Sequence, residues 1–219
     1  MLRLGDQADY SPETMTAARP PKQLRAKRTR RELLAAARQV FARQGYEGAT
    51  VEDIARAAGC SKGAYYFHFA SKEETLLALL EAWIADRSQR LAQAAAALPD
   101  GLLPAITRAI SWQETGWEPQ LLVEFWSQGE HNERVGRRLN EAFAWWQRTL
   151  ADAIGKAGAH DGSMPGLSAQ ASAASMLALA DGLALQACLR SGAARSGLTQ
   201  QMPVAFALLA RPGSLRRAG

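Results

Sequence analysis

The stretch TVEDIARAAGCSKGAYYFHFASK, residues 50–72, constrains the fold more than any other part of the 219-residue chain. Thr50 is a good N-cap residue, and Asp53 three positions later can close a variant of the capping box. Apolar residues then recur at helical spacing as far as Gly59. Because glycine accepts the left-handed geometry that ends helices, this pattern predicts a short helix between Thr50 and Gly59.

Two further helix starts follow within the same stretch. Ser61 is placed to cap a second short helix, and Ser71 with Glu74 is placed to form a capping box for a third, longer one. Two short helices joined by a tight turn that contains glycine are the layout of a helix-turn-helix. In that motif the second helix enters the DNA major groove.

The segment from Arg28 to Leu76 resembles the TetR family of transcriptional regulators. The shared features, in order, are Gly45-Tyr46, Thr50, Ile54-Ala55, Ala58-Gly59, the run from Gly63 to Phe69, and Ser71-Lys72-Glu73. The resemblance implies an all-α fold. Its N-terminal three-helix helix-turn-helix DNA-binding head would be followed by a larger helical effector-binding and dimerisation body.

The charge distribution separates the N-terminal third from the rest. Twelve Lys and Arg against four Asp and Glu lie between Arg19 and Lys72, a net charge of +8. The whole chain carries +5, so the remainder carries −3. A basic head on a slightly acidic body is typical of a polyanion-binding protein, although a basic stretch is also compatible with a solvated helix face.

Cysteine and histidine usage argues against several other classes of protein. The two cysteines lie far apart and form no zinc-binding pattern, so we expect no cofactor, no metal and a reducing, cytoplasmic compartment. The three histidines form no catalytic triad, and no phosphate-binding or dinucleotide-binding fingerprint is present, so an all-helical enzyme is the disfavoured alternative. The first fifteen residues lack the apolar core of a signal peptide. We expect no apolar run to be long enough to span a membrane.

Three parts of the chain are expected. Residues 1–21 form a disordered leader, 22–70 the DNA-binding domain, and 71–219 the ligand-binding and dimerisation domain. A basic run from Lys22 to Arg31 lies at the first boundary, as an arm along DNA or as a solubilising tail. Its later part is expected to open a first helix, which Gly45 ends. In the body we expect helices over about 102–114, 119–129, 132–155, 168–190 and 199–210, with a loop at 158–166.

The body contains all six tryptophans, which suit a core, a dimer face or a ligand pocket. The resemblance implies an effector pocket among its helices, and the aromatic composition predicts a small hydrophobic or aromatic effector. The candidate lining residues are Trp112, Trp117, Glu124, Phe125, Trp126, His131 and Trp145.

The segment from Ala169 to Leu189 is rich in small residues, which let helices approach closely. Its Asp181-Gly182 pair is similar to a motif of the penultimate helix in TetR-like proteins. The resemblance therefore implies a homodimer formed through the helices near 168–190 and 199–210. Because an aspartate in an apolar helix is costly without a hydrogen bond, Asp181 is expected to have a partner.

The resemblance also assigns DNA-binding residues, which are Thr50, Ser61, Lys62, Gly63, Ala64, Tyr65, Tyr66, His68 and Lys72. Lys62 and Ala64 are placed to meet base edges, and Gly63 permits close backbone approach at a helix start. The remaining positions are placed to contact phosphates or the groove.

Several of these residues also have structural interpretations. Thr50 and Ser61 are good helix caps, and His68 fits a structural role. Phe67 and Phe69 are expected in the core of the head, and Tyr65 fits either the core or the groove. Cys60 is expected to be a small buried apolar residue rather than a thiol switch.

The hypothesis that these observations favour is a ligand-responsive repressor that binds a pseudo-palindromic operator as a homodimer. Effector binding in the body would favour a state in which the two heads have the wrong spacing for DNA. A transcriptional activator or a broad DNA binder with the same head remains the alternative.

Overall fold

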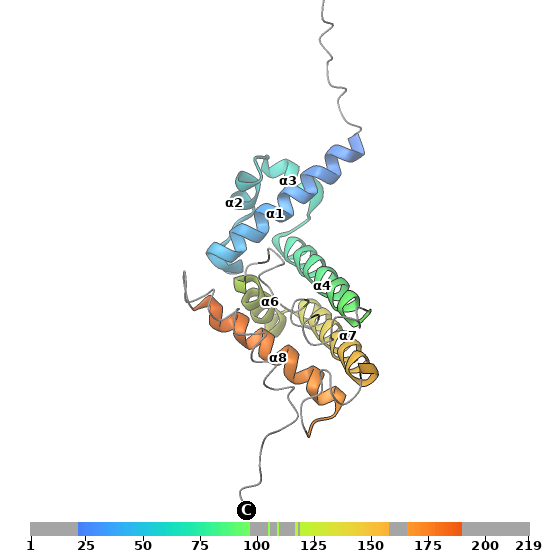
Figure 1. The fold of residues 1–219 in the computed structure, drawn as a ribbon. Helices are drawn as coiled ribbons and strands as arrows, with labels where there is room; N and C mark the ends of the chain where they lie inside the picture. The colour runs from blue at the N-terminus through green and yellow to red at the C-terminus, as the bar shows by residue number, and fades with distance from the viewer. Residues whose placement is uncertain are drawn as a thin grey trace, which may run out of the picture.

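The structure is a computed structural model that describes residues 22–96, 105, 109, 117, 119–157 and 166–189. Within this described part the chain is all helical, with no strand, as the sequence predicts (Figure 1). The helices are α1 (Lys22–Gly48), α2 (Val51–Ala57), α3 (Lys62–His68), α4 (Lys72–Ala96), α6 (Pro119–His131), α7 (Glu133–Ala157) and α8 (Ala169–Cys188).

The head consists of α1, α2 and α3, in which α2 packs against α1 and α3 packs against α2 (Figure 1). Its core is built from apolar residues that recur at helical spacing on α1, among them Leu33, Ala37 and Phe41, all fully buried. Gly45 has a φ of 74°, so the backbone leaves the helical path there, as predicted.

Side-chain caps fix where α2 and α3 begin. The Thr50 hydroxyl accepts a hydrogen bond from the Asp53 amide at 3.1 Å, and the Asp53 carboxylate accepts one from the Thr50 amide at 3.2 Å. Ser61 accepts a hydrogen bond from the Ala64 amide at 3.1 Å. Gly59 follows α2 with a φ of 66°. These contacts confirm the helix boundaries expected from the sequence.

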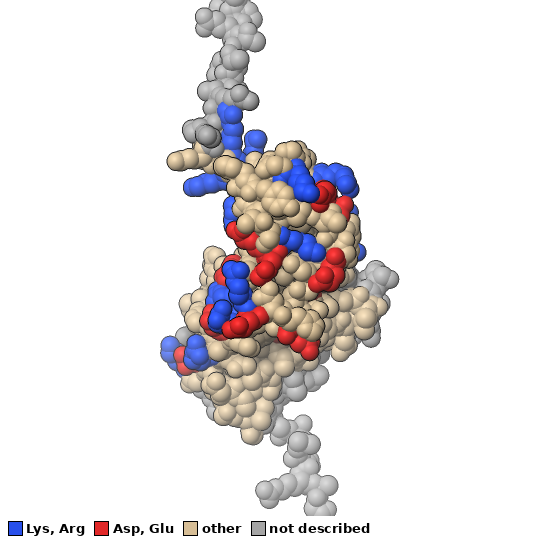
Figure 2. Space-filling view, turned by 180° about the vertical axis from the view of Figure 1, so that it is seen from behind, with Lys and Arg blue, Asp and Glu red and all other residues tan. Residues whose placement is uncertain are grey.

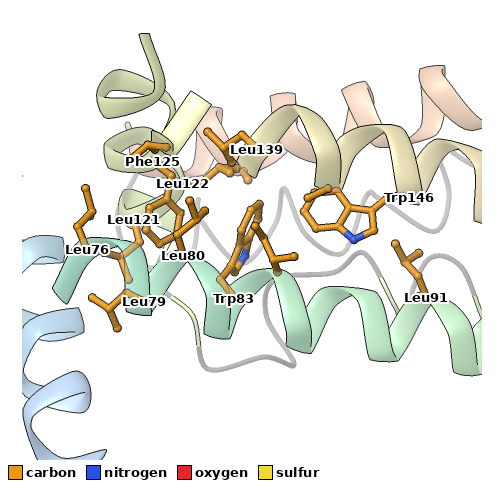
Figure 3. Packing of buried hydrophobic residues seen from close by; sticks show 14 of the residues in the cluster. Leu76, Leu79, Leu80, Trp83, Leu91, Leu121, Leu122, Phe125, Leu139 and Trp146 are labelled. Carbon is orange, nitrogen blue, oxygen red and sulfur yellow. The ribbon is translucent and has the colours of Figure 1, made fainter. Parts of the chain in front are cut away.

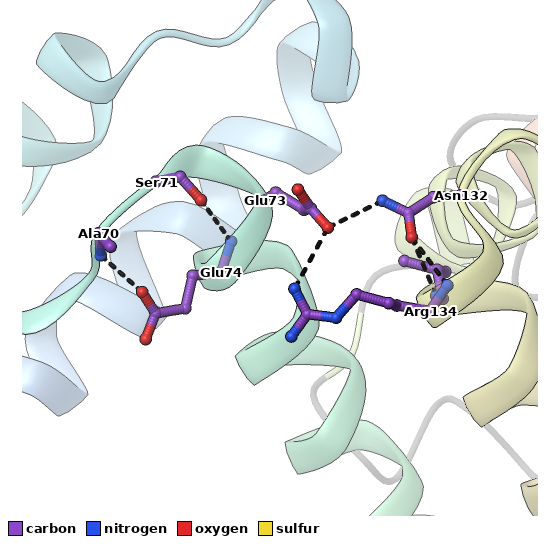
Figure 4. Close-up of polar contacts among 7 residues, drawn as sticks. Ala70, Ser71, Glu73, Glu74, Asn132 and Arg134 are labelled. Carbon is purple, nitrogen blue, oxygen red and sulfur yellow. Dashed lines mark hydrogen bonds and ion pairs between the residues drawn. The ribbon is translucent and has the colours of Figure 1, made fainter.

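The start of α4 departs from its prediction in one contact. Ser71 accepts a hydrogen bond from the Glu74 amide at 3.1 Å, as a cap residue should. The Glu74 carboxylate, however, accepts from the amide of Ala70 at 2.6 Å rather than from Ser71 itself (Figure 4). The reciprocal half of the capping box is therefore displaced by one residue.

The body is a bundle in which α7 packs against α4, α6 and α8 (Figure 1). Aromatic side chains fill the contact between the helices: Trp83 of α4 lies 5.6 Å from the Phe125 ring of α6 and 5.3 Å from the Trp146 ring of α7, measured between ring centroids. Figure 3 shows these rings among leucines from the same three helices. This arrangement joins helices distant in sequence into one core.

Several expectations have a definite outcome in the described part of the chain. The basic run from Lys22 to Arg31 is helical and belongs to α1, so the helix expected from the later part of the run begins already at Lys22. The helices expected at 119–129, 132–155 and 168–190 correspond to α6, α7 and α8. The leader at 1–21 and the helix at 199–210 lie outside the described residues, as do most of the helix at 102–114 and of the loop at 158–166.

One helix corrects the expectation that no apolar run is long enough to span a membrane. By length and composition α8 qualifies, with a mean hydropathy of 1.3 over its most apolar window. Yet α8 carries the buried, ion-paired Asp181 and packs against α6 and α7. These features are typical of a core helix.

Candidate nucleic-acid interface and body cavity

The exposed side of α3 is the surface on which the predicted DNA contacts converge. Lys62, Gly63, Tyr66 and Phe67 are all exposed there, and Ala64 and His68 are half-buried beside them. Seen from behind, Lys and Arg side chains lie over the head and the middle of the molecule with Asp and Glu side chains among them, whereas the lower body is mostly uncharged (Figure 2). An exposed lysine beside exposed aromatic rings suits contact with a polyanion.

Lys62 is paired with Glu52 across the turn between α2 and α3. Both side chains are about half exposed, and the Lys62 ammonium also lies 5.9 Å from the centroid of the Tyr66 ring. The hydrogen bond from Lys62 lowers the pKa of Glu52, and the same bond raises the pKa of Lys62. Glu52 therefore pairs with a basic neighbour in the free protein.

The structure decides the placement of two aromatic residues of α3, of which Tyr65 was left open between core and groove and Phe67 was expected in the core. Tyr65 is fully buried and its hydroxyl bonds to Thr75 and to the Ser71 carbonyl, so it does not face the groove. Burial raises the pKa of its phenol. Phe67, expected in the core, is 73% exposed. Tyr65 and the buried Phe69 are four residues apart and share one side of the helix axis, whereas Phe67 between them points away.

Thr50 and Lys72 both have structural partners in the free protein. The Thr50 hydroxyl donates to the Asp53 carboxylate at 2.6 Å, which lowers the pKa of that carboxyl. The Lys72 ammonium donates to the carbonyls of Tyr46 and Ala49, at 2.7 and 3.1 Å, and lies 4.3 Å from the centroid of the Tyr46 ring. Both side chains therefore stabilise the head, whether or not they also meet phosphate.

The remaining residues of this region have simpler surroundings. Ser61 is the N-cap of α3, as predicted from the sequence. A Cβ added at Gly63 would meet only the Ser61 hydroxyl, at 3.8 Å, so the free protein does not need glycine there. Cys60 packs, partly buried, against the head core, and burial raises the pKa of its thiol. That shift disfavours the reactive thiolate, in agreement with an unreactive residue.

The body contains a second candidate site, a small cavity between α4, α6 and α8. Its volume is about 30 Å³, room for about two water-sized groups. The lining is aromatic and aliphatic except for one ion pair: Trp83, Arg87, Trp117, Pro119, Leu121, Leu122, Phe125, Ala180, Asp181 and Ala184. The Arg87 guanidinium bonds to the Asp181 carboxylate at 2.9 Å, and both side chains are only 5% exposed.

The structure separates the candidate effector-binding residues. Trp117 and Phe125 line the cavity, and Trp126 lines a wider groove between α6, α7 and α8 instead. Three candidates lie elsewhere, because His131 is exposed, Trp145 is 38% exposed, and Glu124 bonds to the head. Trp112 lies outside the described residues.

The sequence interpretation missed the polar centre of this cavity and two of its tryptophan neighbours. Asp181 was expected to have a partner, and that partner is Arg87. Arg87 stands four residues after Trp83 on α4, the spacing at which side chains on a helix meet. This spacing was the sequence signal that could have placed Arg87 beside Trp83. Trp146 completes the arrangement from α7, with its indole nitrogen bonded to the Ser88 hydroxyl at 2.8 Å.

Helix α6 links this cavity to the head. It contributes Phe125 to the cavity, and on its other side the Glu124 carboxylate accepts a hydrogen bond from the Tyr46 amide at 2.8 Å. That amide directly follows the Gly45 bend.

Another polar contact lies within the body, at the start of α4 and close to the head. Asn132, between α6 and α7, donates to the Glu73 carboxylate of α4 at 3.0 Å, and Arg134 lies 3.6 Å from the same carboxylate (Figure 4). These contacts fix the start of α4 against the α6–α7 corner. Among the described residues, no group of histidine, cysteine and carboxylate side chains is arranged to hold a metal ion.

Two family models match separate parts of the chain. The model described as bacterial regulatory proteins, tetR family, matches residues 33–79, and the model described as BetI-type transcriptional repressor, C-terminal, matches residues 113–206. The first covers α2 and α3 with most of α1, and the second covers α6, α7 and α8.

Curated relatives match over a short stretch of the chain. The transcriptional repressor AcnR of Corynebacterium efficiens is 51% identical over 51 residues, 23% of this chain and 27% of the relative. The A-factor receptor protein of Streptomyces griseus is 48% identical over 60 residues, 27% of this chain and 22% of the relative. The match therefore spans about a quarter of the length of these relatives.

Solved structures match over both parts. A TetR-family transcriptional regulator from Rhodococcus sp. has a TM-score of 0.62 at 25% identity, covering 84% of this chain and 99% of that one. A transcriptional regulator from Saccharomonospora viridis, solved in complex with choline, has a TM-score of 0.67 at 23% identity, covering 83% and 96%. The second likeness concerns the fold alone.

Proposed function

Because the chain belongs to the TetR family of DNA-binding transcriptional regulators, we propose that it is a cytoplasmic repressor that binds a pseudo-palindromic operator as a homodimer and is released by a small effector. Residues 22–70 would be the DNA-binding domain and residues from 71 onward the effector-binding and dimerisation domain. The proposal rests above all on the exposed cationic and aromatic side of α3.

The α3 surface supports recognition of a DNA duplex. Lys62 is exposed at the start of the helix, where helix-turn-helix proteins contact base edges, and Tyr66 and His68 follow on the same short helix. Most of the affinity is expected from phosphate contacts, and sequence choice from Lys62 and Ala64. Thr50, Ser61, Gly63 and Lys72 complete the proposed contact set.

The arrangement of α6 supports control by an effector. A ligand that pushes on Phe125 in the cavity would move the helix whose Glu124 holds the Tyr46 amide of the head. Because effectors shift equilibria only by binding two states unequally, this helix is a physical route for such a difference. The cavity lining suits a hydrophobic or aromatic molecule.

The dimer would use α8 and the segment at 199–210. Small side chains on α8, among them Ala174, Ala178 and Gly182, line an open groove of about 380 Å³ with α6 and α7. In a dimer of this kind the two recognition helices would enter major grooves roughly 34–36 Å apart.

The test is fluorescence anisotropy with DNA from immediately upstream of the coding region, at two salt concentrations, against random DNA. We expect tight, salt-dependent binding to the upstream fragment by a dimer, weakened by Lys62→Ala. The matched control is Arg148→Ala, which removes one exposed charge from α7 in the body. Absence of binding to any DNA at low salt would refute the proposal. Equal affinity for random DNA would indicate a broad binder instead.

A further inference from the structure

Arg87 has more hydrogen-bond donors than the protein gives it acceptors. Its Nη1 donates to the Asp181 carboxylate at 2.9 Å. Within the described part of the chain, Nε and Nη2 are buried and have no acceptor. A guanidinium offers five N–H groups in a planar fork, so the nitrogens left over can hold a second acceptor side by side.

Two tryptophan rings lie beside the same guanidinium. Its carbon lies 4.6 Å from the centroid of the Trp146 ring and 5.5 Å from that of the Trp83 ring. With tryptophan rings beside the guanidinium and Nη1 on Asp181, the edge formed by Nε and Nη2 is the part of Arg87 that lacks an acceptor among the described residues. A group that binds Arg87 must therefore be an acceptor that lies in its plane.

This arginine is part of the wall of the body cavity. The other walls are apolar or aromatic, including Trp117 and Phe125. The volume of about 30 Å³ fits a small polar group but is far below the roughly 300 Å³ of a typical ligand site. A larger ligand would need one wall to move, and Trp117, which is only half-buried, can move with the least loss of packing.

The charge of the cavity disfavours a cationic ligand. Asp181 is already neutralised by Arg87, and the two tryptophan faces that would attract a cation are already against the guanidinium. Among the residues that the structure describes, what the cavity lacks is a hydrogen-bond acceptor for the two unpaired nitrogens of Arg87, and an anionic acceptor would bind them best. This differs from the choline-bound relative, whose ligand carries a positive charge.

We propose that the effector is an aromatic or similarly apolar carboxylate whose carboxylate binds the free edge of Arg87 and whose ring lies among Trp83, Trp117 and Phe125. This inference rests on the proposed effector-controlled repressor, and it adds the chemical class of the effector and the residue that selects it. Arg87 thereby acts in both folding and recognition, because Asp181 holds its fork in the orientation that faces the cavity.

The test uses three probes that share a benzyl group: phenylacetate, its isostere phenylacetamide, and the cation benzyltrimethylammonium. Each is titrated into the full-length protein while tryptophan fluorescence is recorded. We expect saturable quenching by phenylacetate, binding at least about tenfold weaker for the amide, and none for the ammonium compound. Equal affinity for acid and amide, tighter binding of the cation, or no binding of the acid at millimolar concentration would overturn the inference.

Two variants separate recognition from folding. Arg87→Lys keeps the positive charge and removes the planar guanidinium fork. It should weaken the binding of phenylacetate by at least about tenfold and leave the affinity for phenylacetamide unchanged. Trp117→Ala, which removes a half-buried side chain from the cavity wall, should weaken the binding of phenylacetate and of phenylacetamide to the same extent. If Arg87→Lys does not fold, the Trp117→Ala result and the wild-type ranking of the three probes still decide the matter.

A parallel anisotropy assay on the upstream DNA distinguishes the two levels of the proposal. If the cation releases DNA and the acid does not, effector control stands and the carboxylate inference fails. If the protein binds no DNA at all, the proposed function fails, while the fluorescence ranking still tests the chemistry of the cavity.

Discussion

The recognition end of the head and the centre of the body each hold a cation–carboxylate pair, with opposite surroundings. Lys62 and Glu52 are about half exposed, so water screens their attraction and the pair can exchange for a phosphate. Arg87 and Asp181 are 5% exposed, so removing one partner leaves the other charge buried. The surface pair is suited to exchange with a ligand, and the buried pair to fix the orientation of two helices.

The largest expected effect comes from breaking the buried pair. Asp181→Ala should lower the free energy of unfolding by about 3–5 kcal/mol, because Arg87 is left charged and buried. Urea denaturation measures the loss. The control is Glu81→Ala, which removes one carboxylate of the largely exposed Arg138 pair and should cost much less. Similar losses in the two variants would show that burial does not distinguish these pairs.

Within the head, two adjacent tyrosines allow the same comparison between buried and exposed polar groups. Tyr65→Phe should lower the free energy of unfolding by about 1 kcal/mol, because the hydroxyl that bonds to Thr75 and Ser71 is lost. Tyr66→Phe, at a 48% exposed ring, should leave the stability unchanged. Thermal unfolding of both variants checks the contrast, and a larger loss for Tyr66→Phe would contradict the placement of the two rings.

Gly63→Ala separates stability from DNA binding at one position of α3. Because the free protein has space for the methyl group, we expect stability to rise by up to about 1 kcal/mol through helix propensity. If DNA approaches the backbone there, affinity for the upstream DNA should fall at the same time. Calorimetry together with anisotropy measures both quantities, and a loss of stability would show that the site is more crowded than the structure indicates.

The smallest effect is expected from releasing Lys62. Glu52→Gln should leave stability unchanged and raise the affinity for DNA severalfold. In the variant the Lys62 ammonium can bind a phosphate without first breaking its ion pair with Glu52, and the local charge is more positive. Anisotropy at low salt, where such effects are largest, is the measurement. When Lys62 is also replaced by Ala, the Glu52→Gln substitution should no longer raise the affinity for DNA. A persisting gain would mean that Glu52 acts through general charge and not through this lysine.

Local signals in the sequence determined where the helices of the head begin and end. Thr50, Ser61 and Ser71 each accept the amide hydrogen bond predicted for a cap, and Gly45 and Gly59 adopt positive φ at predicted ends. These contacts span at most three residues, so they depend on neighbours that the sequence displays directly. For the same reason the all-α class and the helix-turn-helix were predictable.

Only the tertiary structure decided which side chains turn inward and which distant residues meet. Phe67 and Tyr65 are both large aromatic residues, and packing against Thr75 and the rest of the core chose between them. Asp181 needed a partner by its chemistry, but that partner lies 94 residues earlier in the sequence. Composition and local periodicity carry no information about such a separation, because the pairing depends on how α4 and α8 pack in the bundle.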